Sequence, residues 1–268
     1  MSTAADQPIR VVVSGASGRM GREAVGAVLG QPDLRLVGAL DVGEAGRDAA
    51  ELAGLPPCGV CVTSTPAETL RGAHVLVDFT RADACPSIVR AAISEGVACV
   101  VGTTGLSAET IADIDATARS RGVPVLLAPN FALGAVLMMR FAQEAARYYP
   151  WAEIIELHHE KKIDAPSGTA LRTAELVAAV RVSEGVAGEV EKVAGARGAD
   201  HQGVRVHSVR LPGLVAHQEV IFGATGETLT LRHDSLTRAS FMPGVVLAVR
   251  RIGSAPVGVS VGLETMFD

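Results

Sequence analysis

The chain is poor in the features that mark several classes of protein. Aromatic residues make up only 3% of its 268 residues. No basic tract accompanies the net charge of −5, which argues against a nucleic-acid partner. No run of 18 uncharged apolar residues is present, so we expect no membrane span. Residues 1–8 are polar and lack a signal-peptide pattern, and the sequence therefore predicts a cytoplasmic protein.

Cysteine is also scarce. The four cysteines are Cys58, Cys61, Cys85 and Cys99. Cys58 and Cys61 form a lone C-x-x-C, which could be redox-active or half of a metal site, but no second pair completes it. We therefore predict no metal site and interpret all four as buried or loop residues of a reduced chain.

The first half of the chain alternates strand-like and helical segments. Its length suggests about two domains, and 48% of its residues are hydrophobic. Alternation of this kind predicts an α/β fold with a Rossmann-like, doubly wound parallel sheet, whose ligands bind beyond the carboxyl ends of the strands. The predicted strands are 9–13, 34–40, 75–80, 97–105 and 123–131, and the predicted helices include 86–95 and 108–121.

A glycine-rich turn follows the first predicted strand. Gly15, Gly18 and Gly21 recur at three-residue spacing before a helical pattern. Such glycines allow a tight turn and close approach of the backbone to a pyrophosphate at the start of the helix. Ser17 stands where G-x-G-x-x-G has its middle glycine, and the alternative is an ordinary strand-to-helix turn.

Asp41 ends the second predicted strand, where an acidic residue suits a ribose hydroxyl. Val42 follows it, so a 2′-phosphate would need another cation, such as Arg19 or Arg22. This favours NAD but leaves NADP open.

A second segment, 156–170, combines a titratable pair, a cation and a turn that could bind an anion. Residues 153–158 read as a strand, on which Glu156, His158 and, if the strand continues, Lys162 share a face. The segment could therefore bind an acidic small molecule and give it a proton. Alternatively, the histidine is simply buried and hydrogen-bonded.

Ser167, Gly168 and Thr169 precede a helical pattern. Their backbone N–H groups would project from the positive end of a helix, a site for a carboxylate or phosphate. The alternative is that this turn only caps its helix.

The second half indicates a separate α+β domain. A helix is predicted over 133–149, a mobile glycine-rich loop over 184–203, and a mixed or antiparallel sheet from 204 onwards. A helix over 241–252 is expected to return to the first domain. We predict a dinucleotide-binding domain of residues 1–130 and 240–268, and a substrate-binding and oligomerisation domain of residues 131–239. The strand-borne histidines His207, His217 and His233 are expected to be structural.

Several motifs in order along the chain resemble the dihydrodipicolinate reductases of bacterial lysine biosynthesis. They are G-A-S-G-R-M-G, V-D-F-T, V-G-T-T-G, A-P-N-F, E-L-H-H-E-K-K-I-D-A-P-S-G-T-A, G-A-R-G-A-D, H-S-V-R-L-P-G and R-A-S-F. The H-H, K, D-A-P-S-G-T-A block is specific to that family, whereas many families share the glycine loop.

The resemblance implies hydride transfer from NADH or NADPH to C4 of a cyclic imine dicarboxylate, followed by protonation. It implies that His158 is the general acid and that Lys162 binds the substrate and assists proton donation. It also implies that His159, Ser167, Gly168 and Thr169 hold the small dicarboxylate substrate. It also implies a homotetramer. Because the nucleotide and acid sites are expected on different domains, closure should bring them together. The implied cofactor contacts are Gly15, Ala16, Ser17, Gly18, Arg19, Met20, Asp41, Gly102, Thr103, Thr104, Ala128, Pro129, Asn130 and Phe131.

Three other functions stay open at this point. An amino-acid-semialdehyde dehydrogenase would share the nucleotide half, and a non-catalytic NAD(P)-sensing regulator could keep the glycine loop. A metal hydrolase could use Glu156, His158 and His159, but neighbouring residues on a strand face apart, so it would need a third ligand.

Overall fold

The computed structural model describes residues 7–181 and 190–267. The chain divides into two compact units, Met1–Phe131 with Phe241–Asp268, and Ala132–Ser240. The first unit is therefore built from both ends of the chain. Within residues 7–181 and 190–267, every helix is too short or too polar to span a membrane.

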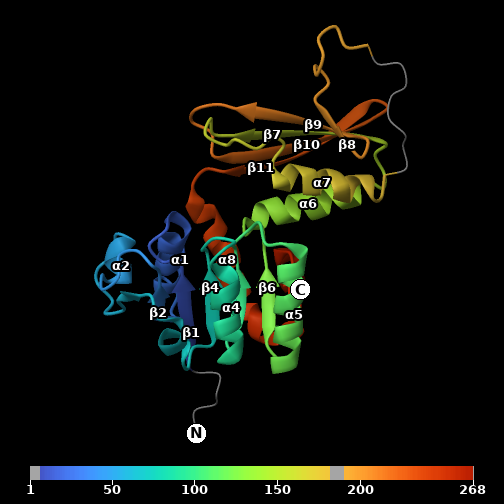
Figure 1. Ribbon diagram of the computed structural model, residues 1–268. Coiled ribbons are helices and arrows are strands. Elements are labelled where there is room, and N and C mark those ends of the chain that lie inside the picture. Colours follow the sequence, from blue (N-terminus) through green and yellow to red (C-terminus); the bar gives the residue numbers. More distant parts are fainter. Residues whose placement is uncertain (1–6, 182–189, 268) are drawn as a thin grey trace. The chain divides into compact units, whose positions relative to one another are not determined.

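The first unit contains a parallel sheet (Figure 1). In spatial order its strands are β12 (Gly258–Val261), β6 (Pro124–Leu127), β5 (Ala98–Val101), β4 (Val75–Asp78), β1 (Ile9–Ser14), β2 (Leu34–Leu40) and β3 (Val62–Thr63). The valines of β1 are fully buried, as expected for a strand covered on both faces. The predicted doubly wound parallel sheet is confirmed.

Helices connect these strands. They are α1 (Arg19–Leu29), α2 (Ala49–Leu52), α3 (Pro66–Leu70), α4 (Cys85–Ser94), α5 (Ala108–Arg121) and α8 (Met242–Arg251). Helix α1 packs against α8, and α4 packs against α3 and α5. Local sequence fixes the ends of α5, because the Ser107 hydroxyl accepts the Thr110 N–H and Gly122 ends the helix with a φ of 69°.

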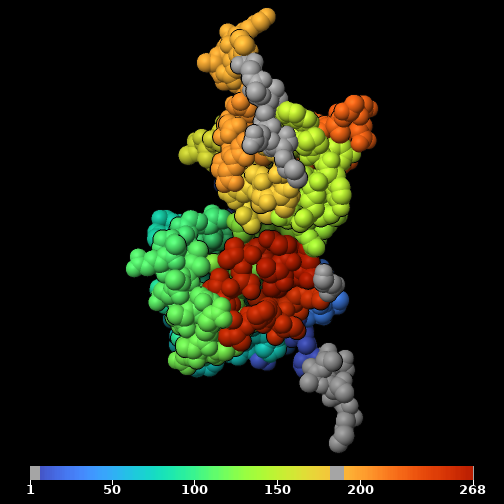
Figure 2. Space-filling view, turned by 90° about the vertical axis from the view of Figure 1, so that its right-hand side faces the viewer, coloured from blue at the N-terminus to red at the C-terminus, as the bar shows by residue number. Residues whose placement is uncertain are grey.

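The C-terminal segment completes the first unit. Strand β12 pairs in parallel with β6, and the Val259 N–H donates to Asp115 on α5. Figure 2 shows this segment, in red, packed among the green residues of the same unit. Sequence reasoning expected the returning helix but not strand β12.

The second unit is a mixed sheet covered on one face by helices α6 (Leu133–Ala145) and α7 (Gly168–Ala178) (Figure 1). Its strands, in spatial order, are β11 (Glu227–Ser235), β10 (Ala216–Ala224), β7 (Trp151–His158), β9 (Val204–Arg210) and β8 (Ala199–His201). Ile154, Val220 and Phe222 form its core with Ala174 and Val177 of α7.

Three expectations for this unit need correction. Helix α6 ends at Ala145 and not at residue 149, because turns replace the helix before the strand begins. Strand β7 ends at His158, so Lys162 does not lie on it. The predicted loop over 184–203 falls partly outside the described residues, but Ala199–His201 forms strand β8 by pairing with β9.

Candidate active site

Glu156 is the centre of a polar cluster in the second unit. It points from β7 toward the helices and is fully buried. Its Oε2 contacts Nδ1 of His158 and accepts a hydrogen bond from Nη1 of Arg210 at 2.9 Å. Its Oε1 accepts from Nη2 of Arg210 at 2.7 Å and from the Ser167 N–H at 3.2 Å. One carboxylate therefore joins a histidine, an arginine and the start of α7.

The charge on Glu156 fixes the orientation of the histidine. Burial raises the pKa of Glu156, but hydrogen bonds from His158 and Arg210 outweigh it and lower the pKa to about 2. The group is therefore a carboxylate at neutral pH and can only accept hydrogen bonds. Nδ1 of His158 must carry the shared proton, which leaves Nε2 as the ring atom able to act on a ligand.

Glu156→Gln is expected to flatten the acid dependence of unfolding. The folded pKa of about 2 lies below the ordinary 4.5, so the carboxylate contributes stability that is complete above the unfolded pKa and is lost as pH falls toward 2. The shift corresponds to ~3 kcal/mol. Urea unfolding at several pH values between about 6 and 3 measures the part of this loss that occurs above pH 3. The exposed Glu160→Gln variant should keep the wild-type pH dependence, and an unchanged dependence in Glu156→Gln would contradict the ion-pair network.

The start of α7 is arranged to accept an anion. Ser167 is the N-cap, and its hydroxyl accepts the Ala170 N–H at 3.2 Å while its carbonyl accepts the Leu171 N–H. Gly168 and Thr169 form the first turn, and a Cβ built at Gly168 would have open space around it. The Ser167 N–H already donates to Glu156, so the predicted anion site is reduced to the exposed Gly168 and the first turn that follows it.

Lys162 lies in the loop between β7 and α7. Its Nζ donates to both carboxylate oxygens of Asp164 at 2.8 and 2.7 Å, and this contact lowers the pKa of Asp164. The Lys162 N–H donates to the carbonyl of His159, a half-buried residue in the same turn. The residues predicted to act together thus lie on one strand end, one loop and one helix start.

Two of the three strand histidines, His207 and His217, have carboxylate partners in the sheet, and His233 packs against helix α6. Nε2 of His207 lies 2.8 Å from Glu153, Nδ1 of His217 lies 2.6 Å from Asp234, and the ring of His233 packs beside Gly134. Among residues 7–181 and 190–267, no group of three or more possible ligands is placed to hold a metal ion. Cys58 and Cys61 are exposed, whereas Cys85 and Cys99 are buried.

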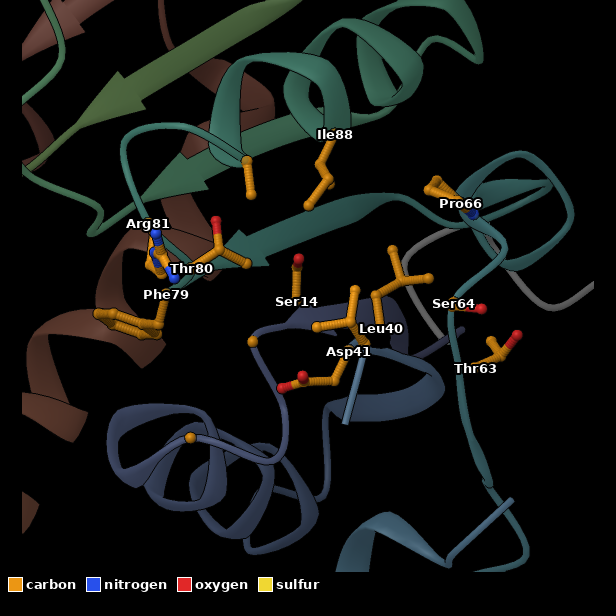
Figure 3. A pocket seen from close by; sticks show the side chains of 14 residues that line it. Ser14, Leu40, Asp41, Thr63, Ser64, Pro66, Phe79, Thr80, Arg81 and Ile88 are labelled. Atoms are coloured by element: carbon orange, nitrogen blue, oxygen red, sulfur yellow. The ribbon is translucent and has the colours of Figure 1, made fainter. Parts of the chain in front are cut away.

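A cavity of about 290 Å³ opens at the carboxyl end of the first sheet (Figure 3). Figure 3 shows Asp41 beside the glycine turn, with Phe79 and Arg81 on one side of the cavity and Thr63 and Pro66 on the other. The lining residues are Ser14, Gly15, Gly18, Leu40, Asp41, Val42, Thr63, Ser64, Pro66, Phe79, Thr80, Arg81, Ala84 and Ile88.

The glycine turn leaves no room for side chains on its inner surface. Gly15 has a φ of 76°, and a Cβ built there would lie 2.5 Å from the carbonyl oxygen of Phe79. A Cβ at Gly21 would lie 2.0 Å from the carbonyl oxygen of Gly15. The N–H groups of Gly15, Ala16 and Gly18 donate to the carbonyls of Leu40 and Gly15, so the N–H groups at the start of α1 are the ones that suit a pyrophosphate. These residues fit a dinucleotide.

Asp41 has a role that its sequence position did not reveal. Its carboxylate accepts the Ser17 N–H at 2.9 Å and the Gly43 N–H at 3.0 Å. The Ser17 hydroxyl in turn donates to the Gly43 carbonyl at 3.1 Å. The residue in the place of the middle glycine thus fastens the glycine turn to the end of β2, and Asp41 faces the cavity from this fixed position.

Only three of the predicted cofactor residues, Gly15, Gly18 and Asp41, line this cavity. Ala16, Ser17, Arg19 and Met20 belong to the same turn and the start of α1. The remaining predicted residues lie at the ends of the next strands, and they are Gly102, Thr103, Thr104, Ala128, Pro129, Asn130 and Phe131.

The residues at the end of β4 and just after it connect the cavity to the loops that follow β5 and β6. Buried Asp78 accepts hydrogen bonds from the hydroxyls of Thr80 at 2.9 Å and Thr103 at 2.6 Å. The ring of Phe79 meets the ring of Phe131 edge-on, with centroids 5.7 Å apart, and leaves no room for a Cβ at Gly102. One strand end therefore supports both the cavity and the neighbouring loops.

Sequence reasoning did not single out several residues of these sites. Arg210 lies opposite His158 in the β7–β9 register, 52 positions away along the chain, so no local motif links them. Phe79 and Arg81 follow V-D-F-T at the end of β4, and the rule that ligands bind beyond strand ends could have identified them.

Comparison with known proteins agrees with this geometry. The protein-family model described as "Dihydrodipicolinate reductase, N-terminus" matches residues 9–131. The family model described as "Dihydrodipicolinate reductase, C-terminus" matches residues 134–267. The chain belongs to the dihydrodipicolinate reductase family. The resemblance stated from the motifs is confirmed, and with it the NAD(P)H-dependent oxidoreductase class.

Individual relatives cover nearly the whole chain. The 4-hydroxy-tetrahydrodipicolinate reductase of Moorella thermoacetica is 53% identical over 97% of this chain and 98% of its own length. That of Listeria monocytogenes serotype 4b (strain F2365) is 50% identical over 97% of this chain and 100% of its own length.

Solved structures agree. Dipicolinate-bound dihydrodipicolinate reductase from Paenisporosarcina sp. TG-14 is 40% identical, with a TM-score of 0.86 over 96% of this chain and 99% of that chain. Amine dehydrogenase from Mycobacterium smegmatis, 17% identical, has a TM-score of 0.68 over 96% of this chain and 95% of that chain, and so shares the fold alone.

Proposed function

We propose that the chain reduces 4-hydroxy-tetrahydrodipicolinate, by way of dihydrodipicolinate, to tetrahydrodipicolinate in lysine and diaminopimelate biosynthesis. One observation carries the proposal. A single buried carboxylate, Glu156, contacts both the ring of His158 and the start of α7 at Ser167. A proton donor and an anion site are thereby held together, which is what reduction of an unsaturated dicarboxylate requires.

In this proposal, the second unit holds the substrate. The first turn of α7, with Ser167, Gly168 and Thr169, receives one carboxylate of the dicarboxylate, and His159 contributes from the preceding turn. These groups bind and orient the ring before any proton moves. The observation of dipicolinate bound to the reductase from Paenisporosarcina sp. TG-14 supports this choice of ligand.

His158 and Lys162 are the proposed catalytic residues. Glu156 keeps the proton on Nδ1 of His158, so Nε2 is the atom that delivers a proton when the ring is doubly protonated. The ammonium of Lys162, held by Asp164, supplies positive charge near the developing negative charge of the reduced ring. In this proposal, both groups act on the dicarboxylate substrate and neither contacts the nucleotide.

The first unit is the proposed dinucleotide-binding domain. Gly15, Ala16, Ser17, Gly18, Arg19 and Met20 would hold the pyrophosphate and Asp41 the adenosine ribose. The predicted residues at 102–104 and 128–131 would contact the rest of the dinucleotide. Bound NADH or NADPH would supply the hydride.

We also propose that the chain is a cytoplasmic homotetramer joined through the second sheet. Helices α6 and α7 cover one face of that sheet, and no described helix covers the other. Half-buried Ile155, Leu157 and Ile221 lie on this other face. Analytical ultracentrifugation measures the mass, and a monomer would contradict this part of the proposal.

The experiment that tests the function is a nucleotide-oxidation assay. The purified protein should oxidise NADH or NADPH only when it is given the freshly made condensation product of pyruvate and aspartate semialdehyde. Aspartate semialdehyde alone tests for a semialdehyde dehydrogenase. No turnover with either nucleotide, or turnover with the semialdehyde alone, would reject the proposal.

Val42→Arg is expected to improve the use of NADPH. Val42 follows Asp41, lines the cavity and is 95% exposed, so an arginine there could reach a 2′-phosphate without disturbing the core. A charge-assisted hydrogen bond contributes ~1.5–3 kcal/mol, which corresponds to a ~10–100-fold lower KM for NADPH. The wild type should prefer NADH.

Steady-state kinetics with both nucleotides checks this expectation. Val42→Ala is the control, because it removes the same side chain without adding charge, and it should keep the wild-type ratio of kcat/KM values. A Val42→Arg variant whose ratio matched that of Val42→Ala would contradict a ribose site at Asp41.

A further inference from the structure

The geometry points to Arg210 as a positioning residue that holds His158, Lys162 and the start of α7 in one arrangement. The inference rests on the proposed function, because it assigns a role in the same site. Arg210 ends strand β9 and lies opposite His158 in the parallel β7–β9 register. Its hydrogen bonds go to the buried Glu156 and to backbone carbonyls. Any effect of Arg210 on the reaction must therefore pass through other residues.

The guanidinium of Arg210 contacts two separate parts of the site. Nη1 and Nη2 donate to the two oxygens of buried Glu156 at 2.9 and 2.7 Å. Nη2 also donates to the carbonyl of Asp164 at 2.6 Å, and Nε donates to the carbonyl of Lys162 at 3.3 Å. Nη1 further donates to the carbonyl of Val209 at 2.8 Å. The side chain therefore fastens a strand to the loop that follows it.

The contact with Glu156 controls two elements at once. Because both carboxylate oxygens are held by Arg210, the carboxylate plane cannot turn. The same two oxygens contact Nδ1 of His158 and the Ser167 N–H. The direction of the imidazole and the position of the helix start are consequently set by one ion pair.

The contacts of Arg210 with the loop fix the backbone around Lys162. Residues 159–167 connect β7 to α7, and Arg210 holds the carbonyls of Lys162 and Asp164 in this loop. Asp164 in turn holds Nζ of Lys162. Arg210 thus fixes the backbone on both sides of Ile163, whose side chain is 99% exposed and gives the loop no packing of its own.

Arginine is suited to this role and lysine is not. A planar guanidinium has five N–H donors and can bind a carboxylate with two of them while the rest reach backbone carbonyls. The ammonium of a lysine would preserve the positive charge but could not hold the Glu156 carboxylate and the backbone carbonyls of the loop at the same time. The Arg210–Glu156 ion pair is also neutral overall, so it adds no net charge beside the positive start of α7.

The test compares Arg210→Met, Arg210→Lys and Glu156→Gln with the wild type. Arg250→Met is the matched control, since Arg250 also binds a carboxylate with two nitrogens, Nε at 2.7 Å and Nη2 at 2.8 Å from Asp33, in the first unit. Circular dichroism checks folding. The readouts are kcat, the KM for each substrate, and calorimetric Kd values for dipicolinate and NADH.

Arg210→Met should lower kcat ~10²-fold and raise the Kd for dipicolinate ~10-fold or more, with the Kd for NADH within about twofold of wild type. Arg210→Lys should restore little of the loss. The double variant Arg210→Met, Glu156→Gln should lose less than the sum of the two single losses, because both residues act as one unit. Arg250→Met should keep wild-type kcat and dipicolinate affinity.

The inference is overturned if folded Arg210→Met keeps wild-type kcat and dipicolinate affinity, or if Arg210→Lys restores both fully. It is also overturned if NADH affinity falls as much as dipicolinate affinity, because that would show general destabilisation. Should Arg210→Met fail to fold, the same criteria apply to Arg210→Lys and Glu156→Gln. A wild type that neither turns over nor binds dipicolinate would instead reject the proposed function.

Discussion

His158→Gln is expected to lower kcat by roughly 10²–10⁴-fold, the usual contribution of a positioned general acid. Glutamine preserves much of the side-chain volume but has no group that gives up a proton near neutral pH. Its amide can still hydrogen-bond to Glu156, so the buried carboxylate keeps a partner. The Kd for NADH should stay within about twofold, because His158 and the glycine turn belong to different units.

The matched control is His207→Gln. His207 lies on neighbouring strand β9 and also contacts a glutamate of β7, with Nε2 2.8 Å from Glu153. We expect this variant to keep wild-type kcat. Stopped-flow measurement of the chemical step and fluorescence titration of NADH give the two quantities. Equal losses of rate and nucleotide affinity in His158→Gln would mean that the residue supports the fold and not the reaction.

Gly21→Ala is expected to abolish most dinucleotide binding. The added Cβ would lie 2.0 Å from the carbonyl oxygen of Gly15, which is backbone and cannot rotate away. Either α1 or the turn must move, and displacement of about 1 Å in a binding cradle can cost ~10²-fold. Overpacking of this kind should also cost ~1–3 kcal/mol of stability.

Gly26→Ala in the same helix is the control for Gly21→Ala. The nearest atom to its added Cβ is Cδ1 of Leu55 at 3.8 Å, an ordinary contact. Because alanine is the better helix former, this variant should gain ~0.5–1 kcal/mol of stability and keep its affinity for NADH. Thermal unfolding and NADH titration test both variants. Normal NADH binding by Gly21→Ala would contradict a pyrophosphate site at this turn.

The nucleotide half illustrates what local sequence can predict. The buried valines of β1, the three glycines and the helical pattern after them lie within about twenty residues, and each is a local requirement of a strand, a turn or a helix. Such requirements leave a readable pattern. The same applies to Ser167, whose hydroxyl caps α7 as its position before a helical pattern predicted.

Contacts between distant segments left no such pattern. Lys162 was expected to share a strand face with His158 if the strand continued, but β7 ends at His158 and Asp164 holds the ammonium. Asp41 was expected only to face a ribose, whereas its carboxylate also fastens the turn through Ser17. The contacts of Lys162 and Asp41 depend on where a strand ends and where a loop folds back, and tertiary packing determines both of these positions.

The sequence alone determined the alternation of strands and helices, the glycine cradle and the order of residues around His158, because these follow from local backbone geometry and periodicity. Only the tertiary structure decided that Arg210 meets Glu156, that β12 completes the first sheet, and that Phe79 joins the cavity to the neighbouring loops. Those contacts are set by strand register and by packing between segments far apart in the chain. No local stretch of residues encodes strand register or the packing between distant segments.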